Sequence, residues 1–216
     1  MRDSSMFMFV IEHLEPVVSK WVWLEYKHAS KIVGRDRLLI TNVKDRREAE
    51  KLKEIALVSR MSITELGTRP DRILVLDPKA NDELTPNDFR DIDFIVIGGI
   101  MGDHPPKGRT YKLLTRKIPG CRARNIGKDQ FSVDGAIYMA MMVSKGYTLK
   151  EISVKVGLEI KVNEYLTIEL PYAYPLVNGR PLISEELVEY LKSDIDRDEA
   201  EYILLGRVKS IVEYDS

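Results

Sequence analysis

The sequence predicts an α/β protein built on a mainly parallel sheet. Short aliphatic runs alternate along the chain with stretches that have helical spacing, an order typical of parallel strands joined by helices. Two runs, ILVLD at 73–77 and FIVIGG at 94–99, are aliphatic almost throughout, as strands buried on both faces are. The last third instead shows alternation of apolar and polar residues, which predicts added antiparallel strands.

The first half of the chain supplies four of the strands. Proline suits the first turn of a helix, glycine ends one, and aspartate caps the start of one, and each occurs at a boundary between these segments. The expected order is a strand at 6–13, a helix from Pro16 to Gly34, a strand at 37–43, a helix from Asp45 to about Ser59, and strands at 73–77 and 94–99.

The second half supplies one more central strand and the added strands. The expected order is a helix at 110–116, a strand at 121–126, a helix from Ser132 or Asp134 to Lys145, antiparallel strands or a hairpin added to the sheet at 151–162 and 164–177, and helices at 184–192 and 199–212. No stretch has the composition of a linker, so residues 1–216 are expected to form a single domain.

The composition excludes several classes of protein. The chain has 33 Lys and Arg against 34 Asp and Glu, so it lacks the basic excess of many RNA-binding proteins, although a local basic patch at 107–128 remains an alternative. Cys121 is the single cysteine, which excludes a disulfide framework within the chain and predicts a cytoplasmic protein. No apolar run reaches the about 18 residues of a membrane span, so no membrane partner is expected. The cysteine–histidine spacing of a metal site is also missing.

Three loops are the candidate binding site. LDPKA at 76–80 and GGIMGDHPP at 98–106 each follow a predicted strand, and NIGKDQFSVDGA at 125–136 leads into a helix. Ligands of open parallel sheets bind beyond the carboxyl ends of the strands. Glycine lets the backbone turn sharply there and approach a ligand closely. Neither a dinucleotide fingerprint nor a phosphate-binding loop is present.

Read together, the three loops resemble those of SPOUT-class methyltransferases, and NIGKDQF is similar to the loop of that class that passes the adenine. The resemblance implies a trefoil knot in the C-terminal half and S-adenosylmethionine as cofactor, held mainly by backbone groups. The residues that it implies for cofactor binding are Leu76, Asp77, Pro78, Gly98, Gly99, Gly102, Ile126, Gly127, Gln130, Ser132, Val133 and Ala136.

A closer resemblance covers most of the chain. VIEHLEP at 10–16, SKWVWLEY at 19–26 and GGIMGDHPPKGRT at 98–110 are similar to the SPOUT subfamily of a fungal ribosomal-protein arginine methyltransferase and its archaeal relatives. The resemblance implies methyl transfer to an arginine of a ribosomal protein. Two alternatives stay open: methylation of ribosomal or transfer RNA, and a cofactor-binding ribosome-assembly module without catalysis. The oligomeric state, homodimer or monomer, also stays open.

Methylation of an arginine requires a group that accepts a proton, because the guanidinium is cationic and a poor nucleophile. A carboxylate can orient the guanidinium and take this proton. The candidates are Glu12, at the end of the first strand, and Asp103, in the second loop, with His104 as a further candidate. Glu25, on the first helix, is expected to line the acceptor groove.

Overall fold

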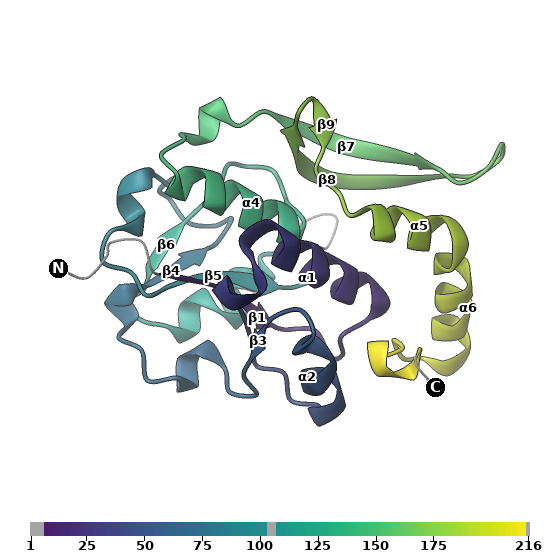
Figure 1. Cartoon of the computed structure of the whole chain (residues 1–216), viewed down its shortest axis with the longest axis horizontal. Helices are drawn as coiled ribbons and strands as arrows, with labels where there is room; N and C mark the ends of the chain where they lie inside the picture. The colour runs from purple at the N-terminus through teal and green to yellow at the C-terminus, as the bar shows by residue number, and fades with distance from the viewer. Residues whose placement is uncertain (1–6, 103–106, 215–216) are drawn as a thin grey trace.

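The computed structural model describes residues 7–102 and 107–214. Within them, six parallel strands form a central sheet in the order β3-β2-β1-β5-β4-β6 (Figure 1). The strands are β1 (Met8–His13), β2 (Leu38–Thr41), β3 (Leu57–Val58), β4 (Ile73–Leu76), β5 (Phe94–Gly99) and β6 (Arg122–Arg124). Because all six run in one direction, their carboxyl ends meet at one edge of the sheet.

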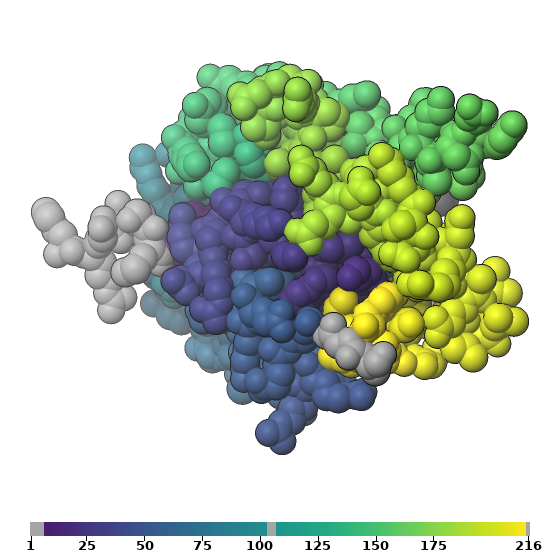
Figure 2. Space-filling model, turned by 45° about the vertical axis from the view of Figure 1, so that its right-hand side comes forward, coloured from purple at the N-terminus to yellow at the C-terminus, as the bar shows by residue number. Residues whose placement is uncertain are grey.

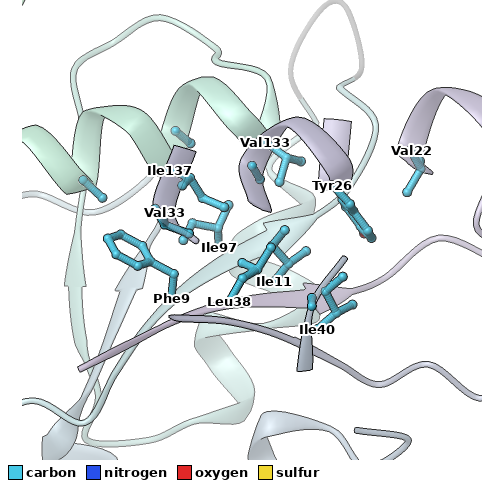
Figure 3. Close-up of a cluster of buried hydrophobic side chains, with 14 of the residues drawn as sticks. Phe9, Ile11, Val22, Tyr26, Val33, Leu38, Ile40, Ile97, Val133 and Ile137 are labelled. Carbon is cyan, nitrogen blue, oxygen red and sulfur yellow. The ribbon is translucent and has the colours of Figure 1, made fainter. Parts of the chain in front are cut away.

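One face of the sheet carries the main hydrophobic core. The helices are α1 (Lys20–Val33), α2 (Arg46–Leu52), α3 (Arg109–Leu113), α4 (Val133–Ser144), α5 (Glu185–Ser193) and α6 (Ile195–Leu205). Side chains of α1 and α4, such as Val22 and Ile137, pack on Phe9, Ile11 and Ile97 of the strands (Figure 3). Burial of these aliphatic and aromatic groups is the main force that holds the two helices on the sheet.

A smaller core lies on the opposite face. Val10, Val75 and Val96 point to this side and pack with Leu114 and Ile118, which follow α3. Strand residues therefore alternate between two apolar layers, which is why the runs in β4 and β5 are aliphatic without interruption. This second layer brings the start of α3 to the carboxyl edge of the sheet.

The last strands form a sheet of their own rather than an addition to the central one. β7 (Val154–Lys161), β8 (Thr167–Val177) and β9 (Arg180–Pro181) are antiparallel in the order β7-β8-β9. Among the described residues, one bridge pairs this sheet with the third loop, between Phe131 and Ala173, where the Ala173 amide donates to the Gln130 carbonyl at 2.8 Å. Leu158, Leu170 and Tyr174 also pack into the main hydrophobic core. The β7–β8 hairpin and α6 lie at the surface away from the central sheet (Figures 1 and 2).

Several boundaries differ from the sequence predictions. The first helix begins at Lys20 rather than Pro16, because the Ser19 hydroxyl caps it by accepting from the Val22 amide. The second ends at Leu52 rather than Ser59, because the chain turns there to pair β3 with β2. The last runs from Ile195 to Leu205 rather than over 199–212, and Gly206 ends it in the left-handed conformation with φ 67°.

Within the described ranges, no helix is long and apolar enough to cross a bilayer.

Candidate functional site

A cavity of about 300 Å³ lies at the carboxyl ends of β4 and β5, where the three loops come together. Segments that are well separated in the sequence thus form one continuous site. Of the residues implied for cofactor binding, those lining the cavity are Leu76, Asp77, Pro78, Gly98, Gly102, Ile126, Gly127, Gln130, Ser132, Val133 and Ala136.

Gly99 has a different place. It is buried beside β1 and is not among the lining residues of the cavity. A Cβ atom on it would lie 2.1 Å from the Tyr26 hydroxyl, which is hydrogen-bonded at 3.0 Å to Nδ1 of His13. Glycine is therefore required here so that α1 can pack against β5. Burial lowers the pKa of His13 to about 4, so this imidazole is neutral at pH 7.

The first loop is held by the side chain of Asp77. This buried carboxylate accepts from the Lys79 amide at 2.9 Å and from the Thr115 hydroxyl at 2.6 Å. Aspartate commonly bonds the backbone two residues ahead in this way, and the bond fixes the turn. The carboxylate of Asp77 thus shapes the cavity wall, and its two oxygens are already used within the protein.

The second loop passes close to the third. A Cβ atom on Gly102 would lie 2.2 Å from Nε2 of Gln130 and 2.4 Å from Cε1 of Tyr172. The Tyr172 hydroxyl donates to the Gly102 carbonyl at 3.1 Å. The β8 strand therefore holds both loops, since it also pairs with residues 130 and 131. A side chain at residue 102 would therefore displace the side chains of Gln130 and Tyr172.

The third loop ends at the N-terminus of α4. The Ser132 hydroxyl caps this helix by accepting from the Gly135 amide at 3.3 Å. The Val133 amide donates to the carboxylate of Glu25 on α1, at 3.2 Å. Ser132 and Val133 line the cavity, so the bond to Glu25 fixes the position of this wall from behind.

Glu25 does not line the cavity, in contrast to the acceptor-groove position expected for it. It is fully buried under α4 and also accepts from Nε1 of Trp21 at 2.7 Å. Desolvation, and secondarily the charge of Asp134, raise the pKa of Glu25 to about 8. Asp134 in turn pairs with Nδ1 of His28 at 2.6 Å. These groups form a buried polar network below the cavity.

Glu12 lies at a second, smaller cavity of about 160 Å³, beside the ends of β1 and β2. Its buried carboxylate accepts from the Thr41 hydroxyl, from the Ser62 hydroxyl at 2.5 Å and from the Ile63 amide at 3.0 Å. The structure does not bring it into the cavity of the three loops. Asp103 and His104 lie outside the described residues.

Comparisons with known proteins agree with this arrangement. A family model described as "Protein arginine N-methyltransferase SFM1-like" matches residues 8–198. The chain belongs to this SFM1-like family. The protein arginine N-methyltransferase SFM1 of Saccharomyces cerevisiae is 29% identical over 201 residues, which cover 86% of this chain and 94% of the yeast protein.

Solved structures show the same relationship. The crystal structure of yeast SFM1 complexed with SAM matches with a TM-score of 0.79 and 27% identity, over 88% of this chain and 91% of that one. The yeast enzyme has also been crystallised with SAH and with MTA, and these structures match with TM-scores of 0.77 and 0.75.

A more distant likeness concerns the fold alone. The crystal structure of a dual-specific Trm10 from Thermococcus kodakaraensis matches with a TM-score of 0.54 at 18% identity, over 67% of this chain and 96% of that one. The predicted fold class, the mainly parallel α/β fold of SPOUT methyltransferases, is confirmed by this likeness and by that to SFM1.

The SFM1-like cavity also contains residues that the sequence reasoning missed. They include the aliphatic Ile97 and Ile100 and the charged Lys79, Lys107, Arg109, Lys128 and Asp129. Arg109 is held in place by Glu15, whose carboxylate also accepts from the Met101 amide at 2.9 Å. Most of these charged residues lie within or beside the three loops, so their position in the sequence could have indicated that they line the cavity. Their charge alone could not, because charged residues are common on protein surfaces and follow no spacing that marks a site. Within residues 7–102 and 107–214, no cluster of side chains is suited to a metal ion.

Proposed function

We propose that this chain transfers the methyl group of S-adenosylmethionine to an arginine side chain of a ribosomal protein. The observation that supports this proposal most directly is that three glycine-containing loops come together at one cavity. The chain that forms this cavity belongs to the SFM1-like family. As a member of this family, the chain is an S-adenosylmethionine-dependent methyltransferase. The ribosomal acceptor is the further step of the proposal, and it rests on the resemblance of segments such as GGIMGDHPPKGRT at 98–110.

The lining of the cavity fits the cofactor. Aliphatic groups of Leu76, Ile126, Val133 and Ala136 offer an apolar surface for a purine ring. Gly98 and Gly102 line the cavity and let the backbone of the second loop lie close to a ligand. A cavity of about 300 Å³ lies at the small end of the range for small-molecule sites. The cofactor, when bound, supplies an electrophilic methyl group on sulfur.

The chain has to orient the acceptor and remove one proton. A guanidinium nitrogen forms the new bond to the methyl carbon as the sulfur–methyl bond breaks, and the nitrogen then loses a proton. Glu12 is fully engaged with three donors away from the cavity, so we assign the proton acceptor to Asp103, which follows the lining residue Gly102. His104 lies next to it in the sequence and is proposed as a second member of this site.

A protein acceptor is favoured over RNA by the charge distribution. In the segment 107–128 several arginines serve the fold: Arg122 donates to the Arg90 carbonyl at 2.9 Å, and Arg124 pairs with Asp88 at 2.8 Å. The ion pairs of Arg124 with Asp88 and of Arg109 with Glu15 offset two of the charges in this segment, and the formal net charge of the chain is −1. An RNA-binding protein needs unpaired cations for the phosphates. A ribosomal acceptor and a single cysteine both fit a cytoplasmic location.

The test is transfer of radiolabelled methyl groups to ribosomes and separated ribosomal proteins from the same organism. We expect label in one protein band, at an arginine identified by mass spectrometry, and its loss with Asp103→Asn. Label in RNA would establish the alternative acceptor. Binding of S-adenosylmethionine in calorimetry without transfer to either class would favour the assembly module.

A further inference from the structure

Lys79 of the first loop lies against the backbone at the start of α3. A Cβ atom on Gly108 would lie 2.3 Å from Cε of Lys79 and 2.8 Å from its Nζ. Gly108 has φ +64°, a conformation that side chains rarely adopt, and both residues line the main cavity. The missing side chain at Gly108 thus leaves room for the lysine stem, which places its ammonium group at the wall where the first loop meets the start of α3.

The charges around this wall are unbalanced. The cavity is lined by four basic side chains, Lys79, Lys107, Arg109 and Lys128, and by two acidic ones, Asp77 and Asp129, among the residues described.

Within the described part of the chain, the ammonium of Lys79 has no anionic partner of its own. The Asp77 carboxylate near it is hydrogen-bonded to the Lys79 amide and to Thr115, and Arg109 is paired with Glu15 at 2.5 Å. For the Lys79 side chain, in contrast, the structure shows neither a hydrogen bond nor an ion pair in the described ranges. A cation held against glycine at a cavity wall is suited to bind an anionic group of a ligand.

We propose that Lys79 binds the carboxylate of the methionine moiety of the cofactor, an inference that rests on the cofactor assigned under the proposed function. S-adenosylmethionine and S-adenosylhomocysteine carry this carboxylate. Methylthioadenosine has the same adenosine and sulfur but lacks it. Three of the four basic side chains, Lys79, Lys107 and Arg109, come from the first loop and from the start of α3. Three aliphatic side chains, Ile126, Val133 and Ala136, come instead from the third loop and α4. The cavity thus has a basic part and an aliphatic part. Lys79 therefore selects ligands by their amino-acid end, and the aliphatic wall accepts the adenosine that all three share.

The experiment compares the dissociation constants of S-adenosylhomocysteine and methylthioadenosine, measured by calorimetry at constant salt. Lys79→Met keeps an unbranched stem over Gly108 and removes the charge. We expect it to weaken S-adenosylhomocysteine binding by about tenfold, as for the loss of a charge-assisted hydrogen bond. Methylthioadenosine binding should stay within about twofold of the wild type, and Lys79→Arg should restore part of the lost affinity.

A matched control is Lys112→Met, which removes an exposed lysine of α3 that does not line the cavity. This variant should leave both constants unchanged, which excludes a general effect of net charge. Equal weakening of both ligands by Lys79→Met, or no weakening of either, would overturn the role of Lys79. If the wild type bound neither ligand, the proposed function itself would fail, so the two failures are distinguishable.

Discussion

The carboxyl ends of β4 and β5 differ from those of β1 and β2, although they belong to the same edge of the sheet. Beyond β4 and β5 the loops contain glycines and enclose a cavity of about 300 Å³. Beyond β1 and β2 the cavity is smaller, about 160 Å³, and the buried Glu12 carboxylate in its wall accepts hydrogen bonds from Thr41, Ser62 and Ile63.

The hydrogen bonds of Glu12 support a structural role for this buried carboxylate, and its part in catalysis stays a prediction. A polar group whose hydrogen bonds are all made within the protein stabilises loops, because breaking them would leave buried donors unsatisfied. A ligand site instead needs open volume and backbone groups that side chains do not cover. The region beyond β4 and β5 has the larger open volume, about 300 Å³ against about 160 Å³ beyond β1 and β2.

The largest effect is expected from filling the open region. Gly102→Val would place side-chain atoms on Gln130 and Tyr172, so these two side chains would have to move from their positions at the second and third loops. We expect cofactor affinity to fall at least about a hundredfold, since a displacement of about 1 Å at such a site can have an effect of this size. Calorimetry with S-adenosylhomocysteine measures it. Gly146→Ala is the control for a strained glycine substitution away from the cavity: Gly146 has φ +102°, a conformation that side chains rarely adopt, although a Cβ there meets no atom within 4 Å. It should lower the stability and leave cofactor affinity unchanged.

A substitution beyond β1 and β2 should lower the stability of the protein more than its methyl transfer. Glu12→Gln leaves the Thr41 and Ser62 hydroxyls and the Ile63 amide with one acceptor oxygen fewer. We expect the free energy of unfolding in urea to fall by about 2 kcal/mol. Cofactor affinity should change less than about twofold. Loss of methyl transfer in a folded variant that still binds cofactor would return Glu12 to the mechanism and reverse the comparison.

The buried Glu25, which accepts a hydrogen bond from Val133 in the cavity wall, makes the stability of the folded protein sensitive to pH. Its pKa in the folded protein, about 8, lies above the usual value of 4.5, so the folded state holds a proton that the unfolded chain has lost. Its contribution to stability is complete below pH 4.5 and is lost as the pH rises towards 8. Between about pH 6.5 and 8, above the range in which His13 titrates, unfolding free energy should fall by about 1–2 kcal/mol.

Urea unfolding of the wild type and of Glu25→Gln at several pH values tests this prediction. The variant removes the titrating group and should show a flatter dependence above about pH 6.5. An equal slope in both proteins would mean that Glu25 is ionised in the folded state throughout this range.

A smaller effect is expected from the contact between β8 and the second loop. Tyr172→Phe removes the hydroxyl that donates to the Gly102 carbonyl and keeps the ring. The loss of one neutral hydrogen bond corresponds to about 1 kcal/mol, so cofactor affinity should weaken by about fivefold. An unchanged dissociation constant would show that the antiparallel sheet supports the loops through its backbone pairing alone.

Much of the central fold could be predicted because its causes are local. Aliphatic runs marked β4 and β5, and glycines after β5 marked a loop that lines the main cavity. The sequence reasoning could not place β3, because two residues, Leu57 and Val58, carry no pattern of their own and pair only since β2 lies beside them. The hairpin was expected to join the main sheet, whereas it forms a separate sheet with β9, because alternation predicts a strand but not its pairing partner.

The sequence by itself determined the class of fold, the family and the three loops, because these depend on periodicity, turn residues and recognisable strings of residues. The tertiary structure decided which polar groups are free. Glu12, Glu25 and Asp77 are equally acidic in the sequence, yet each is buried against donors that come from elsewhere in the chain. Lys79 and Gly108, far apart in the sequence, acquire a shared role only where their loops touch. Hydrogen-bond partners and open volume arise from contacts between distant segments, and no local pattern encodes them.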